Sequence, residues 1–279
     1  MSKLNTMLIR GTRGTLPTCG AEFLRYGGDT TCFSLLTEQG LLIIDAGTGI
    51  ARVTHDLTPA GQVPPITLLF THLHLDHLVG LPGFGPLYSG SASVRLMADP
   101  RRAEDWKQAL HAFMRKPYWP IGLAEADADL KCEDIPVHQD AMNIYGVRVS
   151  WFSVPHPQQC LAYRLVTPDR TVVIATDCEY EKDKVPSAFI AFCSGADFLV
   201  FDANYTPEEH LRHRGWGHST WETAARVAAA ARVKRLVLTH HAPTRSDAQI
   251  DDIVRRAQQS FPATTAACSD MELARPEFG

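Results

Sequence analysis

Three features that many proteins rely on are missing from this sequence. Its seven cysteines form no Cys-x-x-Cys pair, and an odd, scattered set is typical of reduced thiols packed as small hydrophobes. The longest apolar runs, such as Leu41 to Ile44, have the length of a strand and are too short to span a bilayer. Residues 1–5 lead into no apolar signal core, so we expect a cytoplasmic protein with no membrane partner.

An excess of positive charge is also missing. Lys and Arg total 27 against 31 Asp and Glu, which gives a net charge of −4. Proteins that hold nucleic acid usually carry a net or local basic excess. The charge therefore argues against a standing nucleic-acid surface.

Linkers rich in Pro, Gly or Ser are absent as well, and 45% of the residues are hydrophobic. A chain of 279 residues can bury a sizeable core, so we predict a single domain over residues 1–279. The segment 114–140 departs from the pattern, because a start rich in proline and aromatic residues is followed by acidic sequence with few helix formers. It is either an irregular surface connection or a lid or pocket wall, since long ordered loops are often functional.

What the chain does contain is a series of apolar, strand-like runs that end in Asp or His. The residues at these ends are Asp45, His72, Asp177, Asp202 and His240. In layered α/β proteins, ligands gather at the carboxyl edge of the sheet. Asp45 and Asp202 could equally be ordinary turn or cap residues, but that interpretation does not explain all five. We therefore predict an α/β fold with a site at this edge.

Sequence signals mark where helices begin. Asp99-Pro100 predicts an N-cap followed by proline in the first turn. Ser219 to Glu222 and Ser246 to Gln249 both have the capping-box pattern. The first of these opens an alanine-rich helix from about Thr220 to Arg232, whose small residues allow close approach to a sheet.

The densest group of candidate ligands is the stretch from His72 to His77, which also contains His74 and Asp76. In an extended segment, residues i and i+2 point the same way, so His72 and His74 can share one metal ion. In a helix they would not face each other. Asp76 and His77 can reach a second ion, and we predict a metal site here. The remaining ligands must come from elsewhere, and the candidates are Asp177, His240 and His156.

This order of residues resembles the metallo-β-lactamase superfamily. A His-x-His-x-Asp-His motif after a strand is followed by a lone histidine, an aspartate at a strand end and a final Thr-His. The resemblance extends to about Pro243 and implies an αββα four-layer sandwich with two metal ions along one edge. The implied ligands are His72, His74 and His156 for the first ion; Asp76, His77 and His240 for the second; and Asp177 with a hydroxide as bridges.

Nitrogen and oxygen ligands without a thiolate suit Zn²⁺, and also Mn²⁺ or Fe. Two ions about 3.5–4 Å apart lower the pKa of bound water and stabilise the attacking and leaving oxygens. That is hydrolytic chemistry. Asp76 could in addition accept a proton from the water.

One histidine outside this ligand set points to a substrate class. His218 would lie just outside the N-terminus of the alanine-rich helix, where an anion is favoured. It could donate to a phosphate oxygen or protonate a leaving alkoxide, or merely pack beside the cap. The run from Gly215 to Thr220 resembles the ribonuclease Z-like phosphodiesterase branch, which implies a catalytic role for His218. Arg13 could pair with a phosphate or be an ordinary surface arginine, and His241 could line the pocket or simply pack.

We therefore expect a metal-dependent phosphodiesterase that acts on a small or cyclic phosphodiester. Structured RNA is a weaker candidate, because the chain lacks the long basic, glycine-rich arm of ribonuclease Z. A lactone, ester or thioester hydrolase with the same metal site is an alternative, although the lactonase-like members carry a Gly-His motif where His156 lies between two prolines. A non-enzymatic metal sensor is a third hypothesis. A homodimer is implied by the resemblance alone.

Overall fold

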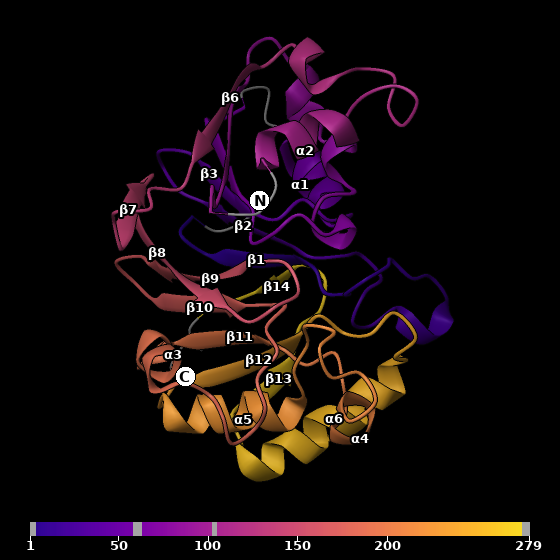
Figure 1. Ribbon diagram of the computed structural model, residues 1–279, viewed down its shortest axis with the longest axis vertical. Coiled ribbons are helices and arrows are strands. Elements are labelled where there is room, and N and C mark those ends of the chain that lie inside the picture. The colour runs from indigo at the N-terminus through magenta and orange to yellow at the C-terminus, as the bar shows by residue number, and fades with distance from the viewer. Residues whose placement is uncertain (1–3, 58–62, 102–104, 275–279) are drawn as a thin grey trace.

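The computed structural model describes residues 4–57, 63–101 and 105–274. Within these residues the strands form two sheets of seven strands each (Figure 1). The first has the spatial order β14-β1-β2-β3-β4-β5-β6 and contains β1 (Met7–Gly11), β2 (Cys32–Leu36), β3 (Leu41–Ile44), β4 (Ile66–Leu69), β5 (Ser93–Ala98), β6 (Asp129–Asp134) and β14 (Met271–Glu272). The second has the order β13-β12-β11-β10-β9-β8-β7 and contains β7 (Ala141–Ile144), β8 (Val147–Val154), β9 (Cys160–Val166), β10 (Thr171–Ala175), β11 (Phe198–Asp202), β12 (Arg235–Thr239) and β13 (Thr264–Ala266).

Each sheet has an antiparallel part and a parallel part. Strands β3 to β6 are parallel in the first sheet, and β10 to β13 are parallel in the second. Parallel neighbours bring their carboxyl ends to one edge, which is where ligands bind in such sheets. The five predicted strand runs correspond to β3, β4, β10, β11 and β12, so these predictions are confirmed.

Helices cover the outer face of each sheet (Figure 1). α1 (Ile50–Leu57) and α2 (Trp106–Phe113) pack on the first sheet, and α3 (Ser187–Cys193), α5 (Trp221–Ala230) and α6 (Asp247–Ser260) pack on the second. The connections contain α4 (Pro207–His210) and the 3₁₀ turns η1 (Ala21–Phe23), η3 (Leu75–His77), η4 (Leu81–Gly83), η5 (Gly85–Tyr88) and η6 (Leu123–Glu125). This is the predicted αββα sandwich.

Strand β3 shows why the central strands are apolar on both faces. Leu41 and Ile43 pack into the core beneath α1 and α2, whereas Leu42 and Ile44 pack into the core between the sheets. All four side chains are buried, and each fully buried Leu or Ile is worth about 1.5–3 kcal/mol relative to an exposed one. A strand covered on both sides therefore reads as a continuous apolar run instead of an alternating one.

The predicted start of α2 is wrong. The helix begins at Trp106, and Asp105 is its N-cap, with a side chain that accepts backbone N–H bonds of the first turn. Asp99, which we expected to cap a helix with Pro100 in the first turn, instead accepts hydrogen bonds from the backbone and guanidinium of Arg101. The bond from the backbone of Arg101 is one that an N-cap would accept, but residues 100–101 form a turn and α2 begins only at Trp106, after residues 102–104, which lie outside the described part of the chain.

The two capping boxes had different outcomes. At α6 the predicted box is present, because Ser246 Oγ accepts from the backbone of Gln249 and the Gln249 side chain accepts from the backbone of Ser246. At α5 the N-cap is Thr220 instead of Ser219. The hydroxyl of Ser219 donates to the carbonyl of Cys178 at 2.5 Å, so a distant segment claims it.

The segment 114–140 is not irregular throughout. Its later part contains β6, which pairs in parallel with β5 at the edge of the first sheet and was not predicted. Its earlier part is anchored where Trp119 Nε1 donates to the hydroxyl of Tyr88 at 2.9 Å. The lid or pocket-wall role stays a prediction, as does the single domain over residues 1–279. None of the described helices is both long and apolar enough to cross a membrane.

Candidate metal centre

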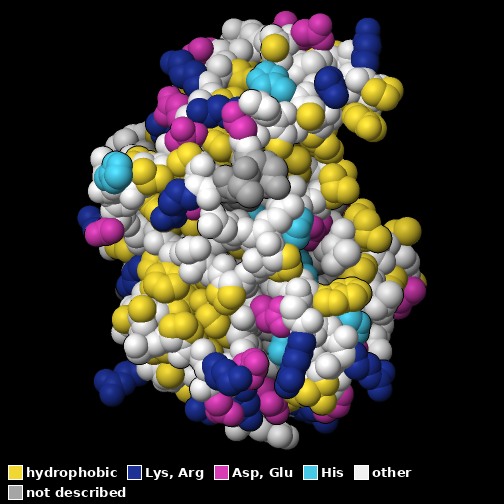
Figure 2. Space-filling model, viewed as in Figure 1, with side chains coloured by type: hydrophobic (Ala, Val, Ile, Leu, Met, Phe, Trp, Pro, Cys, Tyr) yellow, Lys and Arg dark blue, Asp and Glu magenta, His cyan; other side chains and the backbone are white. Residues whose placement is uncertain are grey.

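Five chain segments meet at the carboxyl edge of the two sheets. His72 follows β4 of the first sheet, and His156 follows β8 of the second. Asp177 follows β10, Asp202 ends β11 and His240 follows β12. Residues that are up to 168 positions apart, from His72 to His240, thereby reach one place. In Figure 2, histidine side chains are visible near mid-height, between the upper and lower halves of the molecule.

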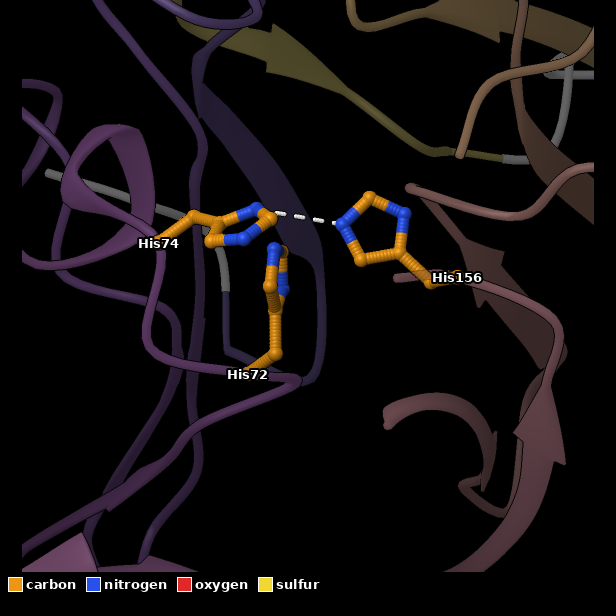
Figure 3. Close-up of side chains that lie close together, drawn as sticks. All are labelled: His72, His74 and His156. Carbon is orange, nitrogen blue, oxygen red and sulfur yellow. Dashed lines mark hydrogen bonds between the residues drawn. The ribbon is translucent and has the colours of Figure 1, made fainter. Parts of the chain in front are cut away.

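A first cluster consists of His72, His74 and His156. Each offers a ring nitrogen, and these atoms all lie within 4.8 Å of one another. The shortest contact joins His156 Nε2 and His74 Nδ1, at 3.1 Å. Figure 3 shows the three rings turned toward one another, with His72 and His74 on one chain segment and His156 on another. Three imidazoles around one point form a typical ligand set for a transition-metal ion.

A second cluster consists of Asp76, His77, Asp177 and His240, all buried. Asp177 is central to it, because its Oδ2 lies 3.1 Å from His77 Nε2 and its Oδ1 lies 3.3 Å from His240 Nε2. Asp76 Oδ2 lies 3.4 Å from His77 Nε2 and 3.5 Å from His240 Nε2. Asp177 Oδ1 is also 3.9 Å from His72 Nε2, so it connects the second cluster to the first.

The predicted extended start of the motif is present. Residues 70–74 have neither helix nor strand structure, and η3 begins only at Leu75. His72 and His74 therefore reach the same cluster, as the i and i+2 spacing requires, and the 3₁₀ turn directs Asp76 and His77 to the other cluster.

Three aspartate or histidine residues at strand ends have a left-handed backbone. The φ angles are 61° at Asp45, 52° at Asp177 and 59° at His240. This region is uncommon for residues other than glycine, although Asp, Asn and His visit it more often than most. Such conformations cost about 1–3 kcal/mol each and persist where the surrounding structure holds them, often at functional sites.

Buried acceptors fix the orientation of two of the histidines. His77 Nδ1 donates to Asp45 Oδ2 at 2.8 Å, and His156 Nδ1 donates to the carbonyl of Gly217 at 2.9 Å. Asp45 is itself held by the backbone N–H and the hydroxyl of Thr71, both at 2.8 Å. A proton on Nδ1 leaves the lone pair of Nε2 directed into the clusters, which is the tautomer that a metal ligand needs.

Several atoms at the centre of the site have no hydrogen bond within the described residues. They are Nε2 of His72, His77 and His240 and Oδ2 of Asp177, all of them buried. Leaving a buried polar atom unsatisfied usually costs about 1–3 kcal/mol, and these four face one another. Lone pairs of nitrogen and carboxylate oxygen that converge in this way fit a divalent metal ion.

Burial and charge set the protonation of the clusters. Burial, assisted by neighbouring histidines, lowers the pKa of His72 well below its usual value and also lowers the pKa of His74. These rings are therefore neutral, as ligands must be. Burial alone would lower the pKa of His77, but the carboxylates of Asp177 and Asp76 outweigh it and hold that pKa well above the usual value. The second cluster thus contains two carboxylates, whereas the first consists of histidines alone.

His218 lies beside both clusters. Its Nδ1 is 2.9 Å from Asp202 Oδ2 and 3.8 Å from Asp177 Oδ1, and its ring centroid is 4.9 Å from that of His240. Burial would lower the pKa of His218, but the Asp202 carboxylate outweighs it and raises that pKa to about 9. Asp202 is held in turn by the backbone N–H groups of Asp177 and Asn204, both at 3.0 Å.

Arg13 and His241 are not brought into the clusters. The guanidinium of Arg13 is fully buried and donates to the carbonyls of Gly27, Ala242 and Arg245, so it supports the surrounding loops. A contact between Arg13 and a phosphate stays a prediction. His241 is also buried, and burial lowers its pKa to about 3. Packing, one of the two roles we considered for His241, is the one its contacts support.

Sequence reasoning missed the residues that orient the candidate ligands and His218 through hydrogen bonds. Asp45 and Asp202 had been noted only as strand ends, and that position is the signal that could have identified them. Glu179 carried no signal at all. Its carboxylate accepts backbone N–H bonds from Gly215 at 2.7 Å and from Gly217 at 2.8 Å, and so orders the loop that carries His218.

Two sheets between helical layers, with paired His and Asp clusters at one edge, define a metal-dependent hydrolase of the metallo-β-lactamase fold. The chain matches the beta-lactamase superfamily domain over residues 41–241, which is more than half of its length. It therefore belongs to this superfamily.

Relatives and solved structures agree with this assignment. Ribonuclease Z of Gemmatimonas aurantiaca is 24% identical over an alignment of 288 positions, gaps included, which covers 87% of this chain and 89% of that protein. The metallo-β-lactamase fold protein YhfI from Bacillus subtilis superposes with a TM-score of 0.72 at 18% identity, covering 96% of this chain and 97% of the other. A diphosphatase of the PhnP family superposes with a TM-score of 0.70 at 19% identity, covering 97% of each chain. The two structural likenesses establish the fold.

Proposed function

We propose that the protein is a phosphodiesterase that uses two divalent metal ions and acts on a small or cyclic phosphodiester. The observation that carries this proposal is the His218–Asp202 pair, because it sets a proton donor beside two metal-ligand clusters. The similarity to ribonuclease Z supports the same reaction type, because a ribonuclease cleaves phosphodiester bonds.

In this proposal the two clusters hold one ion each. His72, His74 and His156 bind the first ion, Asp76, His77 and His240 bind the second, and Asp177 lies between them. The donor set of imidazole and carboxylate suits Zn²⁺ best, and also accommodates Mn²⁺ or Fe. The unsatisfied Nε2 and carboxylate atoms described above support the assignment.

Two bound ions would supply an activated water and would stabilise the attacking and leaving oxygens. The protein's own residues supply the proton transfers. His218 protonates the leaving oxygen, and Asp202 keeps the His218 ring oriented and charged. Asp76 could accept a proton, but its Oδ2 already accepts the backbone N–H of Thr15 at 2.7 Å, so metal ligation is the role we assign to it.

RNA is the second candidate substrate, and the names of the sequence relatives favour it. The net charge of −4 favours the small phosphodiester, because RNA binding depends on neutralising many phosphates. Hydrolysis of a short cyclic or dinucleotide phosphodiester with no activity on precursor tRNA would support the small substrate. The opposite pattern would make RNA the substrate.

The reaction type can be tested with the metal-loaded protein on phosphodiesters, lactones and thioesters, with Zn²⁺ or Mn²⁺. We expect turnover of bis-p-nitrophenyl phosphate and cyclic nucleotides. Activity on lactones or thioesters alone would contradict the phosphodiesterase. No turnover despite bound metal would favour the sensor.

The role of His218 can be tested by the dependence on the leaving group. His218→Ala should lose about 10²–10⁴-fold in kcat on an alkyl phosphodiester, whose alkoxide needs a proton to leave. It should lose far less on bis-p-nitrophenyl phosphate, whose phenolate is a stable anion. Metal content should be unchanged. An equal loss on both substrates, or loss of metal, would contradict the role of proton donor.

A further inference from the structure

An exposed tryptophan lies at the edge of the site and has no part in the chemistry above. Trp216 exposes 63% of its surface, although it precedes His218 by only two residues. The carbonyl of the next residue, Gly217, accepts a hydrogen bond from the candidate ligand His156. Trp216 is therefore fixed close to the clusters and open to solvent.

A chain of ring contacts connects Trp216 to His218. The Trp216 ring meets His213 edge-on, with ring centroids 4.8 Å apart. His213 stacks on Tyr205 with an interplanar angle of 9°, and Tyr205 meets His218 edge-on at 5.7 Å. His213 is also held through Nδ1, which donates to the carbonyl of Glu209 at 2.8 Å. One edge of the indole is thus supported, while much of the ring stays exposed.

The backbone around Trp216 is equally well held. The residues on either side of it, Gly215 and Gly217, both donate to the carboxylate of Glu179, and the N–H of Trp216 donates to the carbonyl of His213 at 3.1 Å. A binding surface that is ordered in advance loses little entropy when a ligand arrives. An exposed indole on so constrained a loop is arranged as a platform.

We propose that Trp216 forms a stacking subsite for a flat aromatic group carried by the substrate. This inference rests on the proposed function, because it places the phosphodiester at the clusters and its ring on the indole. An exposed apolar side chain also borders the clusters on the side of the first sheet. Leu75 lies between the candidate ligands His74 and Asp76 in the sequence and exposes 62% of its surface. The substrate class is then a phosphodiester with a nucleobase or an aryl ester group, not a purely aliphatic one.

Stacking explains specificity without a dedicated hydrogen-bond pattern. Every nucleobase and every aryl group has a π face, and removing the aromatic partner of a stacked base typically weakens binding by roughly 5- to 100-fold. The subsite therefore selects for an aromatic ring and discriminates little between one ring and another.

The first experiment compares an aryl phosphodiester with one that carries no ring. Bis-p-nitrophenyl phosphate offers the indole a flat ring, whereas glycerophosphoethanolamine offers only aliphatic groups. Trp216→Ala should raise KM for the aryl substrate by about 5- to 100-fold and leave KM for the aliphatic substrate unchanged, and Trp216→Phe should restore most of the preference. Leu211→Ala is the matched control, because Leu211 is 66% exposed and lies in the same segment but carries no ring. Equal KM changes for both substrates, or none, would overturn the inference.

The second experiment does not depend on turnover. Titration calorimetry on the zinc-loaded protein compares adenosine 5′-monophosphate with ribose 5-phosphate, which differ only in the base. We expect the nucleotide to bind at least fivefold more tightly, with the difference lost in Trp216→Ala and kept in Leu211→Ala. If that holds while no phosphodiester is hydrolysed, the proposed function fails and the subsite stands. If phosphodiesters are hydrolysed but the two ligands bind alike, the subsite fails and the function stands.

Discussion

At the scale of single residues, the site depends on side chains that contact the candidate ligands without being ligands themselves. Asp45 is fully buried and accepts three hydrogen bonds, from Thr71 N, Thr71 Oγ1 and His77 Nδ1, each at 2.8 Å. It thereby fixes the tautomer of His77 and adds negative charge behind it. Carboxylates in this position raise the basicity of the ligand and are sensitive to substitution.

Asp45→Asn should weaken metal binding by about 10- to 100-fold. The amide has one acceptor oxygen where the carboxylate has two, so either Thr71 or His77 loses its partner. Affinity is measured by competition with a chromophoric chelator. Asp99→Asn is the matched control, because Asp99 is also buried and directly follows a strand of the same sheet, but pairs with Arg101. Equal affinities for the two variants would contradict the role of Asp45.

The sequence revealed the ligands better than their supports. His72 to His77 form a local motif, and their order with His156, Asp177 and His240 carries the family resemblance. The partner of Asp45 lies 32 residues away and that of Asp202 lies 16 residues away, so neither pairing can be read from spacing. For Arg13 the sequence allowed either a phosphate contact or a surface position, whereas the structure buries its guanidinium among backbone carbonyls.

At the scale of elements, the loop before α5 is the most constrained part of the site. Gly217 has a φ of 92°, and a Cβ there would lie 2.1 Å from His156 Nδ1. Gly215 has a φ of 84°, but a Cβ there would meet nothing within 4 Å. The two glycines share the backbone conformation and the Glu179 carboxylate, and differ in what a side chain would strike.

Gly217→Ala should therefore lose metal from the first cluster, while Gly215→Ala should not. Both variants place alanine at a positive φ and should be destabilised by more than about 1 kcal/mol. Only the first also displaces the His156 ring. Metal content per chain and the melting temperature are the measurements, and a similar loss of metal in both variants would show that loop strain, not the contact with His156, decides the outcome.

Elements were predictable where their signals are local. The runs of β3, β4, β10, β11 and β12 are apolar on both faces, and Ser246 with Gln249 closes a box within four residues. The cap at Ser219 failed because Cys178, 41 residues away, accepts its hydroxyl. Strand β6 was not predicted because it is an edge strand whose residues are charged and partly exposed, so that its sequence resembles that of a loop.

At the scale of the whole molecule, the two clusters join the halves of the sandwich. His72, His74, Asp76 and His77 come from the first sheet, and His156, Asp177 and His240 come from the second. Three apolar cores pack the layers of the sandwich, and none of them includes a candidate metal ligand. The hydrophobic interior therefore does not depend on bound metal. The homodimer stays a prediction, because nothing in a single chain tests it.

Removal of metal should consequently lower the melting temperature without unfolding the protein. An ion present at a hundred times its Kd stabilises the folded state by about 2.7 kcal/mol. Each kcal/mol moves the melting temperature of a chain of this size by about 2–4 °C, so a chelator should lower it by roughly 5–10 °C per ion. For His156→Ala, which lacks one ligand, the chelator should lower the melting temperature by less. Added Zn²⁺ should return the chelator-treated wild-type protein to its original melting temperature. An unchanged melting temperature after complete removal of metal would contradict a site that joins the two sheets.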